Sequence, residues 1–151
     1  KKNSPLIIAE GYATAKSLHT ATGFTTVVAF DGGNLPVIAE TMRNQNPDRS
    51  IVIAADDDPL KVEKVGHNPG LEAAKRAAER SNAQILKPSL TADEQLQGLT
   101  DHNDVHVARG FDLFRREIRQ QLSDLGISTS RSRSMQISPK KQKNQSNQMS
   151  V

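Results

Sequence analysis

Four short runs of β-branched and aliphatic residues constrain the fold more than any other feature of the chain. They span residues 6–9, 26–30, 51–55 and 84–87. The runs are mostly apolar and do not alternate with polar residues, as expected for strands covered on both faces. Stretches with helical features separate them, so the order is βαβαβαβ. This order predicts a Rossmann-like α/β fold in three layers, with a four-stranded, mainly parallel sheet between helices.

Capping residues and apolar spacing place the helices. The expected helices are 13–22, 35–45, 69–81 and about 107–122, with a short helix at 92–99 inside an otherwise irregular segment, 91–103. Gly23 ends the first helix, and Asn68-Pro69 opens the third as a cap followed by a first-turn proline. Val107, Phe111 and Phe114 begin an apolar stripe that continues along the last helix at spacings of three and four.

Composition divides the chain into a core and a tail. Residues 1–127 are expected to form one domain, with its ordered part at about 6–122. Residues 128–151 hold five Lys/Arg, no Asp/Glu and few apolar residues, so this tail is expected to be disordered and not needed for the fold. The chain opens on Lys1-Lys2, which suggests a piece of a longer protein.

Composition also excludes several kinds of site. The chain has no Cys, which rules out disulfides, zinc ribbons and thiol nucleophiles and fits a reducing compartment. No apolar run approaches the roughly 20 residues needed to cross a bilayer. We therefore expect a cytoplasmic protein without a membrane partner.

Carboxylates follow three of the four predicted strands. Glu10 follows the first strand, Asp31 the second, and Asp56, Asp57 and Asp58 the third. In open parallel sheets, ligands bind beyond the carboxyl ends of the strands. If the first and third strands are neighbours, their ends lie about 4.8 Å apart, and carboxylates at that spacing repel each other unless a cation neutralises them. Oxygen ligands without Cys or His favour Mg²⁺ or Mn²⁺.

Simpler interpretations exist for each of these features. The Asp56–Pro59 segment can be a strand-to-loop junction, Glu10 a helix cap and Asp31 part of a flexible acidic turn. Asp57 points away from its two neighbours in an extended segment and can be merely solvated. The four histidines lack metal-ligand spacing and are expected at surface or loop positions. The remaining candidates are basic residues that either contact nucleic acid or are solvated: Arg43, Lys61, Lys64, Arg109, Arg115, Arg116 and Arg119.

The ordered set of motifs resembles the Toprim family, and most closely the Toprim domains of plasmid and phage primases, including those attached to conjugative relaxases. Four segments carry the resemblance: Glu10-Gly11 with Ala13-Thr14-Ala15, Asp56-Asp57-Asp58, Asn68 to Ala74, and Asp101-His102-Asn103-Asp104. They match E-G-x-A-T-A, A-x-D-x-D, N-P-G-x-x-A-A and D-x-N-D in order, over roughly residues 6–122. His102 departs from the aromatic residue, such as Phe, that the resemblance leads us to expect.

The resemblance implies a Mg²⁺- or Mn²⁺-dependent catalytic core of a DNA primase-like protein, acting in nucleotidyl or phosphoryl transfer in plasmid replication or conjugation. Asp56 and Asp58 would hold the ions, with Asp101 and Asp104 as secondary or water-mediated ligands. Glu10 would act as acid/base or as a further ligand. The implied partners are DNA, nucleotides and other domains of a parent chain. No aromatic platform for stacking bases is evident in the sequence, so the chain alone is not expected to make primers.

Two alternatives remain open. A non-catalytic scaffold or DNA-docking domain of a relaxase would keep the same fold. A receiver-like signalling domain is suggested by Lys87-Pro88 after the fourth strand. Receivers, however, carry their acidic pair after the first strand, where this chain has only Glu10.

Overall fold

The sheet has four parallel strands, as the sequence predicts. The computed structural model describes residues 4–129. The strands are β1 (Leu6–Ala9), β2 (Thr25–Val28), β3 (Ile51–Ala54) and β4 (Gln84–Leu86), in the order β2-β1-β3-β4. Ala9 pairs with both Val28 and Ala54, so β1 and β3 are neighbours and their carboxyl ends meet at one edge of the sheet.

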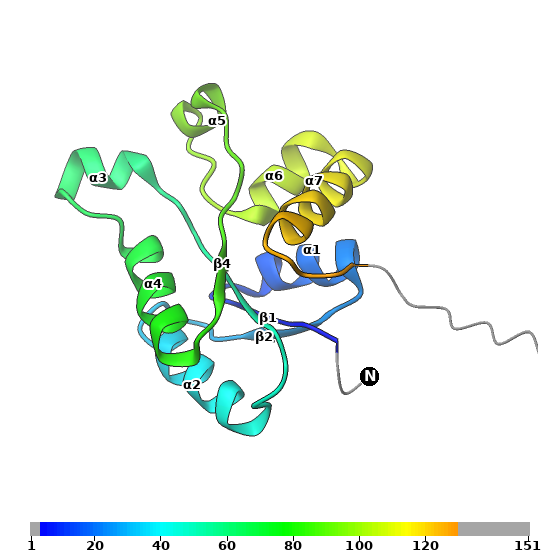
Figure 1. The fold of residues 1–151 in the computed structure, drawn as a ribbon. Coiled ribbons are helices and arrows are strands. Elements are labelled where there is room, and N and C mark those ends of the chain that lie inside the picture. Colours follow the sequence, from blue (N-terminus) through cyan, green and yellow to red (C-terminus); the bar gives the residue numbers. More distant parts are fainter. Residues whose placement is uncertain (1–3, 130–151) are drawn as a thin grey trace, which may run out of the picture.

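Helices cover both faces of the sheet and give three layers (Figure 1). The helices are α1 (Tyr12–Thr22), α2 (Leu35–Gln45), α3 (Pro59–Val65), α4 (Pro69–Ser81), α5 (Ala92–Leu96), α6 (His102–Arg109) and α7 (Phe111–Asp124). Helices α2 and α4 lie on one face, and α1, α6 and α7 lie on the other. The short helices α3 and α5 lie beyond the carboxyl edge, above the sheet in this view.

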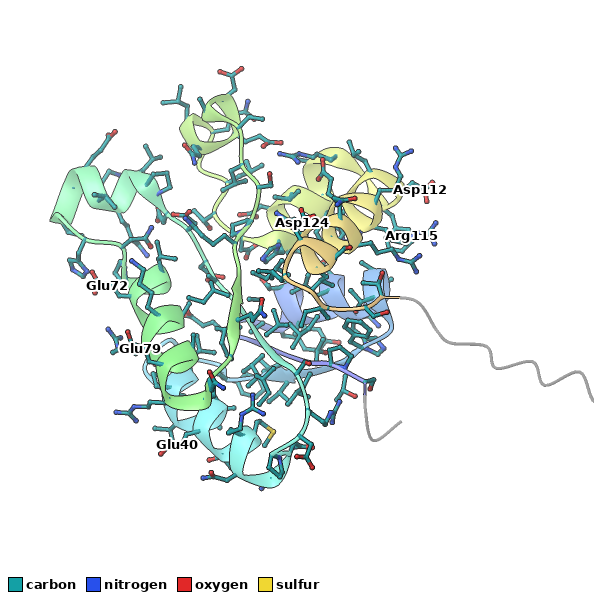
Figure 2. All side chains as sticks on the ribbon, viewed as in Figure 1. Glu40, Glu72, Glu79, Asp112, Arg115 and Asp124 are labelled. Atoms are coloured by element: carbon teal, nitrogen blue, oxygen red, sulfur yellow. The ribbon has the colours of Figure 1, made fainter. Side chains whose placement is uncertain are left out.

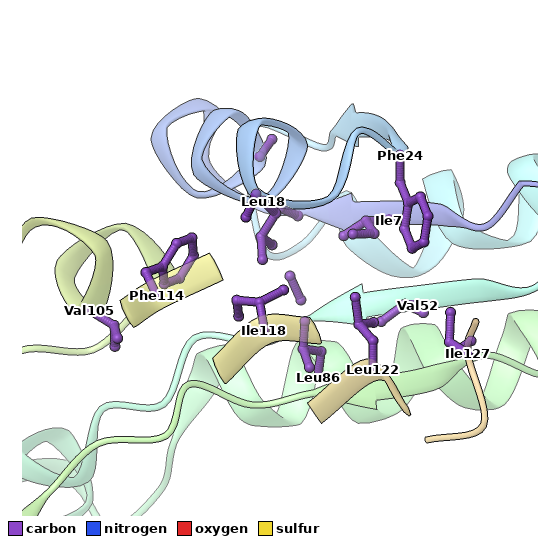
Figure 3. Packing of buried hydrophobic residues seen from close by; sticks show 14 residues of the cluster. Ile7, Leu18, Phe24, Val52, Leu86, Val105, Phe114, Ile118, Leu122 and Ile127 are labelled. Atoms are coloured by element: carbon purple, nitrogen blue, oxygen red, sulfur yellow. The ribbon is translucent and has the colours of Figure 1, made fainter. Parts of the chain in front are cut away.

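Each face of the sheet has its own apolar core, because successive side chains of a strand point to opposite faces. Ile7 and Ala9 of β1 join the core under α1 and α7, whereas Leu6 and Ile8 join the core under α2 and α4. The fully buried ring of Phe114 lies in the first core with other side chains of α7 (Figure 3). The second core uses the alanines of α4, which let this helix pack closely: Ala73, Ala74, Ala77 and Ala78.

The last predicted helix is wrong in one respect, because the chain breaks at Gly110. Helix α6 ends at Arg109 and α7 begins at Phe111, with Gly110 at φ 80° and ψ 160° between them. A positive φ is inexpensive only for glycine. The break removes Val107 from the predicted apolar stripe and leaves it 76% exposed, while Phe114, Ile118 and Leu122 keep the predicted buried face.

The short helix expected at 92–99 is present as α5, whereas α3 and the first part of α6 were not predicted. Asp58 caps α3, with Pro59 in its first turn and Gly66 at its end. Thr91 and Glu94 form a capping box that starts α5, and Asp101 and Asp104 form another that starts α6. These are recognised start signals, so the missed helices were detectable from the sequence.

Arg109 lies in an ion-pair network, not on the solvent face of a helix. Its Nε donates to Glu94 Oε1 at 2.8 Å, and its Nη1 donates to Glu117 Oε2 at 2.8 Å. The hydrogen bond from Arg109 is the largest cause that lowers the pKa of Glu94 to about 2. Arg109 therefore ties α5 and α7 to the end of α6 and is not available to nucleic acid.

The predicted tail lies mostly outside the described part of the chain. Ile127 is 5% exposed and packs in the core that contains Phe114, while residues 130–151 are not among the described residues. No helix within residues 4–129 is both long enough and apolar enough to cross a membrane.

Candidate functional site

A cavity of about 320 Å³ lies at the carboxyl edge of the sheet. The ends of β1, β2 and β3 deliver its carboxylates, because parallel strands present their carboxyl ends at the same edge. The acidic residues that line it are Glu10, Asp31, Asp56 and Asp58. Two basic residues, Lys61 and Arg76, line the same space. We call this space the acidic cavity.

Asp56 has the most perturbed carboxylate in the cavity. Its Oδ1 is buried and has no hydrogen-bond partner among the described residues. Burial is the main cause that raises the pKa of Asp56 from 3.8 to about 7, and the charges of Asp101, Glu10 and Asp104 raise it further. An unpaired buried carboxylate oxygen is costly in a folded protein, so a ligand or cation would relieve a real electrostatic penalty here.

Glycines allow the backbone to approach these carboxylates closely. A Cβ at Gly70, in the first turn of α4, would lie 2.9 Å from the Asp56 Cβ and 3.0 Å from the Asp56 carbonyl oxygen. A Cβ at Gly32 would lie 3.1 Å from Glu10 Oε2. Any larger residue at Gly70 would have to displace the backbone at Asp56, so the Asn-Pro-Gly segment fixes the wall of the cavity.

The three consecutive aspartates have three different environments. Asp58 Oδ1 accepts from the Lys61 backbone N–H at 3.1 Å and caps α3. Asp57 accepts from Asn68 Nδ2 at 2.8 Å and pairs with Lys87 Nζ at 3.0 Å. Asp57 is therefore not merely solvated, which corrects the simpler interpretation. Its side chain anchors the loop after β3 to the start of α4 and the end of β4.

Asp101 and Asp104 do not line the acidic cavity. Asp101 Oδ1 accepts from the Asp104 backbone N–H at 2.8 Å, and Asp104 Oδ2 accepts from the Thr100 backbone N–H at 2.8 Å. Their charges nonetheless reach Asp56 and raise its pKa. Across residues 4–129, no three acidic or His side chains converge closely enough to form a ready-made metal site.

The histidines do not belong to the cavity, but the prediction that they lie on surfaces or loops is wrong for two of them. His102 is 1% exposed, its Nε2 lies 3.1 Å from the Leu86 carbonyl oxygen, and burial lowers its pKa to about 4. A neutral ring in the core explains why His can stand where the family pattern suggests an aromatic residue. His106 is half-buried, with its Nδ1 2.9 Å from Ser17 Oγ and its ring stacked on Phe114.

Two aromatic residues at the carboxyl edge escaped the sequence interpretation. Phe30 is 80% exposed and Tyr12 is 67% exposed. Each is close in the chain to a cavity residue, since Phe30 precedes Asp31 and Tyr12 follows Glu10 by two positions. These exposed rings are the residues that bear on the expectation that no aromatic platform is evident. Phe30 was assigned to the end of an apolar strand, and only its backbone conformation, φ 65°, shows that it leaves the sheet.

Comparisons with known proteins agree with this architecture. Residues 5–112 match the family model described as Toprim domain. Two proteins from Escherichia coli, each named DNA primase TraC, are 43% identical over 83 residues and 42% identical over 89 residues. The matches cover 55% and 59% of this chain but only 6% and 8% of those proteins. No solved structure matches significantly. Because the family model covers most of the described residues and includes all four motif segments, the chain belongs to the Toprim family.

Proposed function

We propose that this chain is the divalent-metal-dependent catalytic core of a DNA primase-like protein, acting in nucleotidyl or phosphoryl transfer on DNA during plasmid replication or conjugation. The observation that carries the proposal is the buried, unpaired Asp56 Oδ1 at the wall of a cavity shared with Glu10 and Asp58. The similarity to the DNA primases named TraC supports the choice of reaction.

The residues present fit a hard divalent cation. All acidic donors of the cavity are carboxylate oxygens, which suit Mg²⁺ or Mn²⁺, and Asp56 Oδ1 is a buried acceptor without a donor. Asp56 and Asp58 would hold the ion together with Glu10, while Asp101 and Asp104 would act through water or through their charge. Such an ion lowers the cost of attack by a 3′-oxygen on a phosphate and of charge on the leaving pyrophosphate.

The chain's own residues would provide the remaining functions. Lys61 and Arg76 line the cavity and would bind phosphate oxygens of the substrate. If Glu10 does not bind the ion, its carboxylate would instead receive the proton of the attacking hydroxyl group as a general base. The pair formed by Asp57 and Lys87 would keep the loop after β3 in place during the reaction.

Titration with Mn²⁺ tests the assignment of the metal ligands. We expect saturable binding that Asp56→Asn and Asp58→Asn each weaken at least tenfold, because each removes a charged oxygen ligand, an effect of about 1.4 kcal/mol or more. Isothermal calorimetry measures it. Asp48→Asn is the matched control, since Asp48 is exposed and lines a different pocket with Ser50 and Ile51 at the start of β3. Unchanged binding in both cavity variants would refute the assignment.

A second, basic groove is our candidate for the path of a DNA strand. It has a volume of about 1110 Å³ and lies along α1, the edge strand β2 and α7. Its lining includes Lys16, His19, Arg115 and Arg119 but no acidic residue. Tyr12, which lies two positions after Glu10 in the chain, also lines the groove. Arg115 lies on the outer side of α7, whereas Glu40, Glu72 and Glu79 lie on the opposite helix layer (Figure 2).

Charge reversal in the basic groove is expected to weaken single-stranded DNA binding. Each phosphate contact to a single strand contributes about 0.7 to the salt slope, so losing one contact costs roughly fivefold at 0.1 M salt, and reversal costs more. We expect Arg119→Glu to reduce affinity about tenfold and to lower the salt slope in fluorescence anisotropy. Lys75→Glu, an equal charge change on an exposed position of α4, should have little effect. Equal losses in the two variants would argue against the groove.

The two alternatives have different outcomes in the same experiments. A scaffold or docking domain would bind DNA through the basic groove but would not bind Mn²⁺ through Asp56. One contact is compatible with the receiver-like alternative, because Lys87 pairs with Asp57. However, the Toprim match includes both residues, and the acidic pair that receivers need after β1 is missing.

A further inference from the structure

Phe30 combines two properties that folding alone disfavours. Its backbone has φ 65°, in the left-handed region, which bulky side chains seldom adopt because of steric strain. Its side chain is also 80% exposed, so the strain is not offset by burial of the ring. A single exposed apolar residue is ordinary, but an exposed aromatic residue in a strained conformation at the edge of a cavity suggests a function.

The surrounding backbone holds Phe30 in this conformation. Ala29 N–H donates to the Ala9 carbonyl at 2.9 Å, and Phe30 N–H donates to the Glu10 carbonyl at 2.8 Å. After Phe30, the Asn34 N–H donates to the Asp31 carbonyl at 3.1 Å, and Asn34 Nδ2 lies 3.3 Å from the Ala29 carbonyl oxygen. These bonds tie both sides of Phe30 to the end of β1 and to the turn that follows.

The left-handed turn takes the Phe30 ring out of the core. In a continued strand, Phe30 would share the face of Val28, which packs against the core under α1 and α7. Instead the ring is exposed to solvent, and Asp31, Gly32 and Gly33 immediately after it line the acidic cavity. Phe30 therefore immediately precedes the stretch of chain that lines the acidic cavity, which also contains the basic side chains of Lys61 and Arg76.

We propose that Phe30 is the stacking platform for the base of a nucleotide whose phosphates occupy the acidic cavity. This inference rests on the proposed function, and it assigns the base position, which the carboxylates do not define. The cavity contains cations for phosphates but no aromatic side chain in its lining, so an aromatic surface at its rim supplies what a nucleotide still needs. A protein partner is less suited, because the residues after Phe30 are Asp31, two glycines and Asn34, which form no apolar patch.

A tryptophan at this position provides a direct probe, because the chain has no other Trp. In Phe30→Trp, a nucleoside triphosphate with Mn²⁺ is expected to quench the indole fluorescence, as stacking on a base does. Inorganic tripolyphosphate with Mn²⁺ should bind without this quenching. Val107→Trp is the matched control, because Val107 is 76% exposed on α6, and its fluorescence should not respond to either ligand.

Removing the ring separates binding from folding. We expect Phe30→Gly to lower nucleoside triphosphate affinity about tenfold while leaving tripolyphosphate affinity unchanged. The melting temperature should stay the same or rise, because glycine adopts a positive φ without strain. If the nucleoside triphosphate and tripolyphosphate both bind, but the base changes neither the fluorescence of Phe30→Trp nor the affinity for the ligand, the stacking role is wrong and the proposed function stands. If neither ligand binds the original protein, both the proposed function and this inference fail.

Discussion

Asp56→Asn is expected to stabilise the protein in EDTA at pH 8 and to abolish its stabilisation by Mn²⁺. Burial and neighbouring charges raise the pKa of Asp56 from 3.8 to about 7, so the ionised carboxylate destabilises the folded state. This difference in pKa corresponds to an upper limit of roughly 4 kcal/mol. Solvent screening of the partly exposed side chain and the remaining polarity of Asn reduce the expected gain to about 2 kcal/mol. Thermal and urea unfolding measure the difference.

The pH dependence gives this prediction a definite sign. Below about pH 3.8 the carboxyl group is protonated in both the folded and the unfolded states, so it costs nothing. Between 3.8 and 7 the unfolded state releases its proton first, and the penalty grows with pH until it is complete above 7. The gain from Asp56→Asn should therefore be near zero at pH 4 and largest at pH 8. An Asp56→Asn variant that is less stable than the original protein at pH 8 would contradict the prediction.

The penalty at Asp56 fits a site that sacrifices stability for ligand binding. Asp101, Glu10 and Asp104 all raise the pKa of Asp56, and none of the three side chains belongs to the apolar cores. Natural proteins commonly keep such unfavourable charges where function needs them. The strained backbone of Phe30 is a second cost, at the rim of the same cavity. The two costs lie after β3 and β2, the two strands that flank β1 in the sheet.

The sheet and the position of the cavity were predictable because they depend on local patterns. Short apolar runs alternating with helices define a parallel sheet, and a parallel sheet places all carboxyl ends at one edge. The approach of Glu10 to Asp56 also requires β1 and β3 to be neighbours, which the sequence left as a condition and the structure confirms. The break at Gly110 was less predictable, since the apolar spacing from Val107 to Leu122 fits one continuous helix equally well.

The partners of individual side chains were not predictable, because they depend on residues far away in the chain. Asp57 pairs with Lys87, which lies 30 positions later in the chain. Arg109 forms an ion pair with Glu94, on an earlier helix. A charged residue on a helix gives the same local signal whether it is solvated or paired. The conformation of Phe30 also depends on the hydrogen bond to Glu10, which exists only once β1 and β2 are paired.

The chain alone is expected to make no primers, although it should bind Mn²⁺. Templated synthesis requires a template strand and two nucleotides held in line, and this positioning supplies much of the rate. The acidic cavity of about 320 Å³ is at the small end of the range for ligand sites and has room for one set of phosphates. The TraC primases that the chain resembles are far longer, since it matches only 6% and 8% of them. Labelled ribonucleotides, single-stranded DNA and Mn²⁺ provide the assay.

A chimera tests the complementary expectation that this domain can serve as the catalytic core of a primase. Residues 4–129, which keep all of α7 and its buried side chains, would replace the similar segment of the DNA primase TraC, and we expect the chimera to synthesise oligonucleotides. Asp56→Asn in the chimera should reduce the rate at least roughly a thousandfold, equivalent to losing about 4 kcal/mol of transition-state stabilisation. Asp48→Asn is the control and should leave the rate near that of the chimera. A chimera that is folded and binds DNA but is equally active with Asn at position 56 would show that the acidic cavity is not the catalytic centre. Primer synthesis by residues 1–151 alone would show instead that the chain needs no other domain to position its substrates.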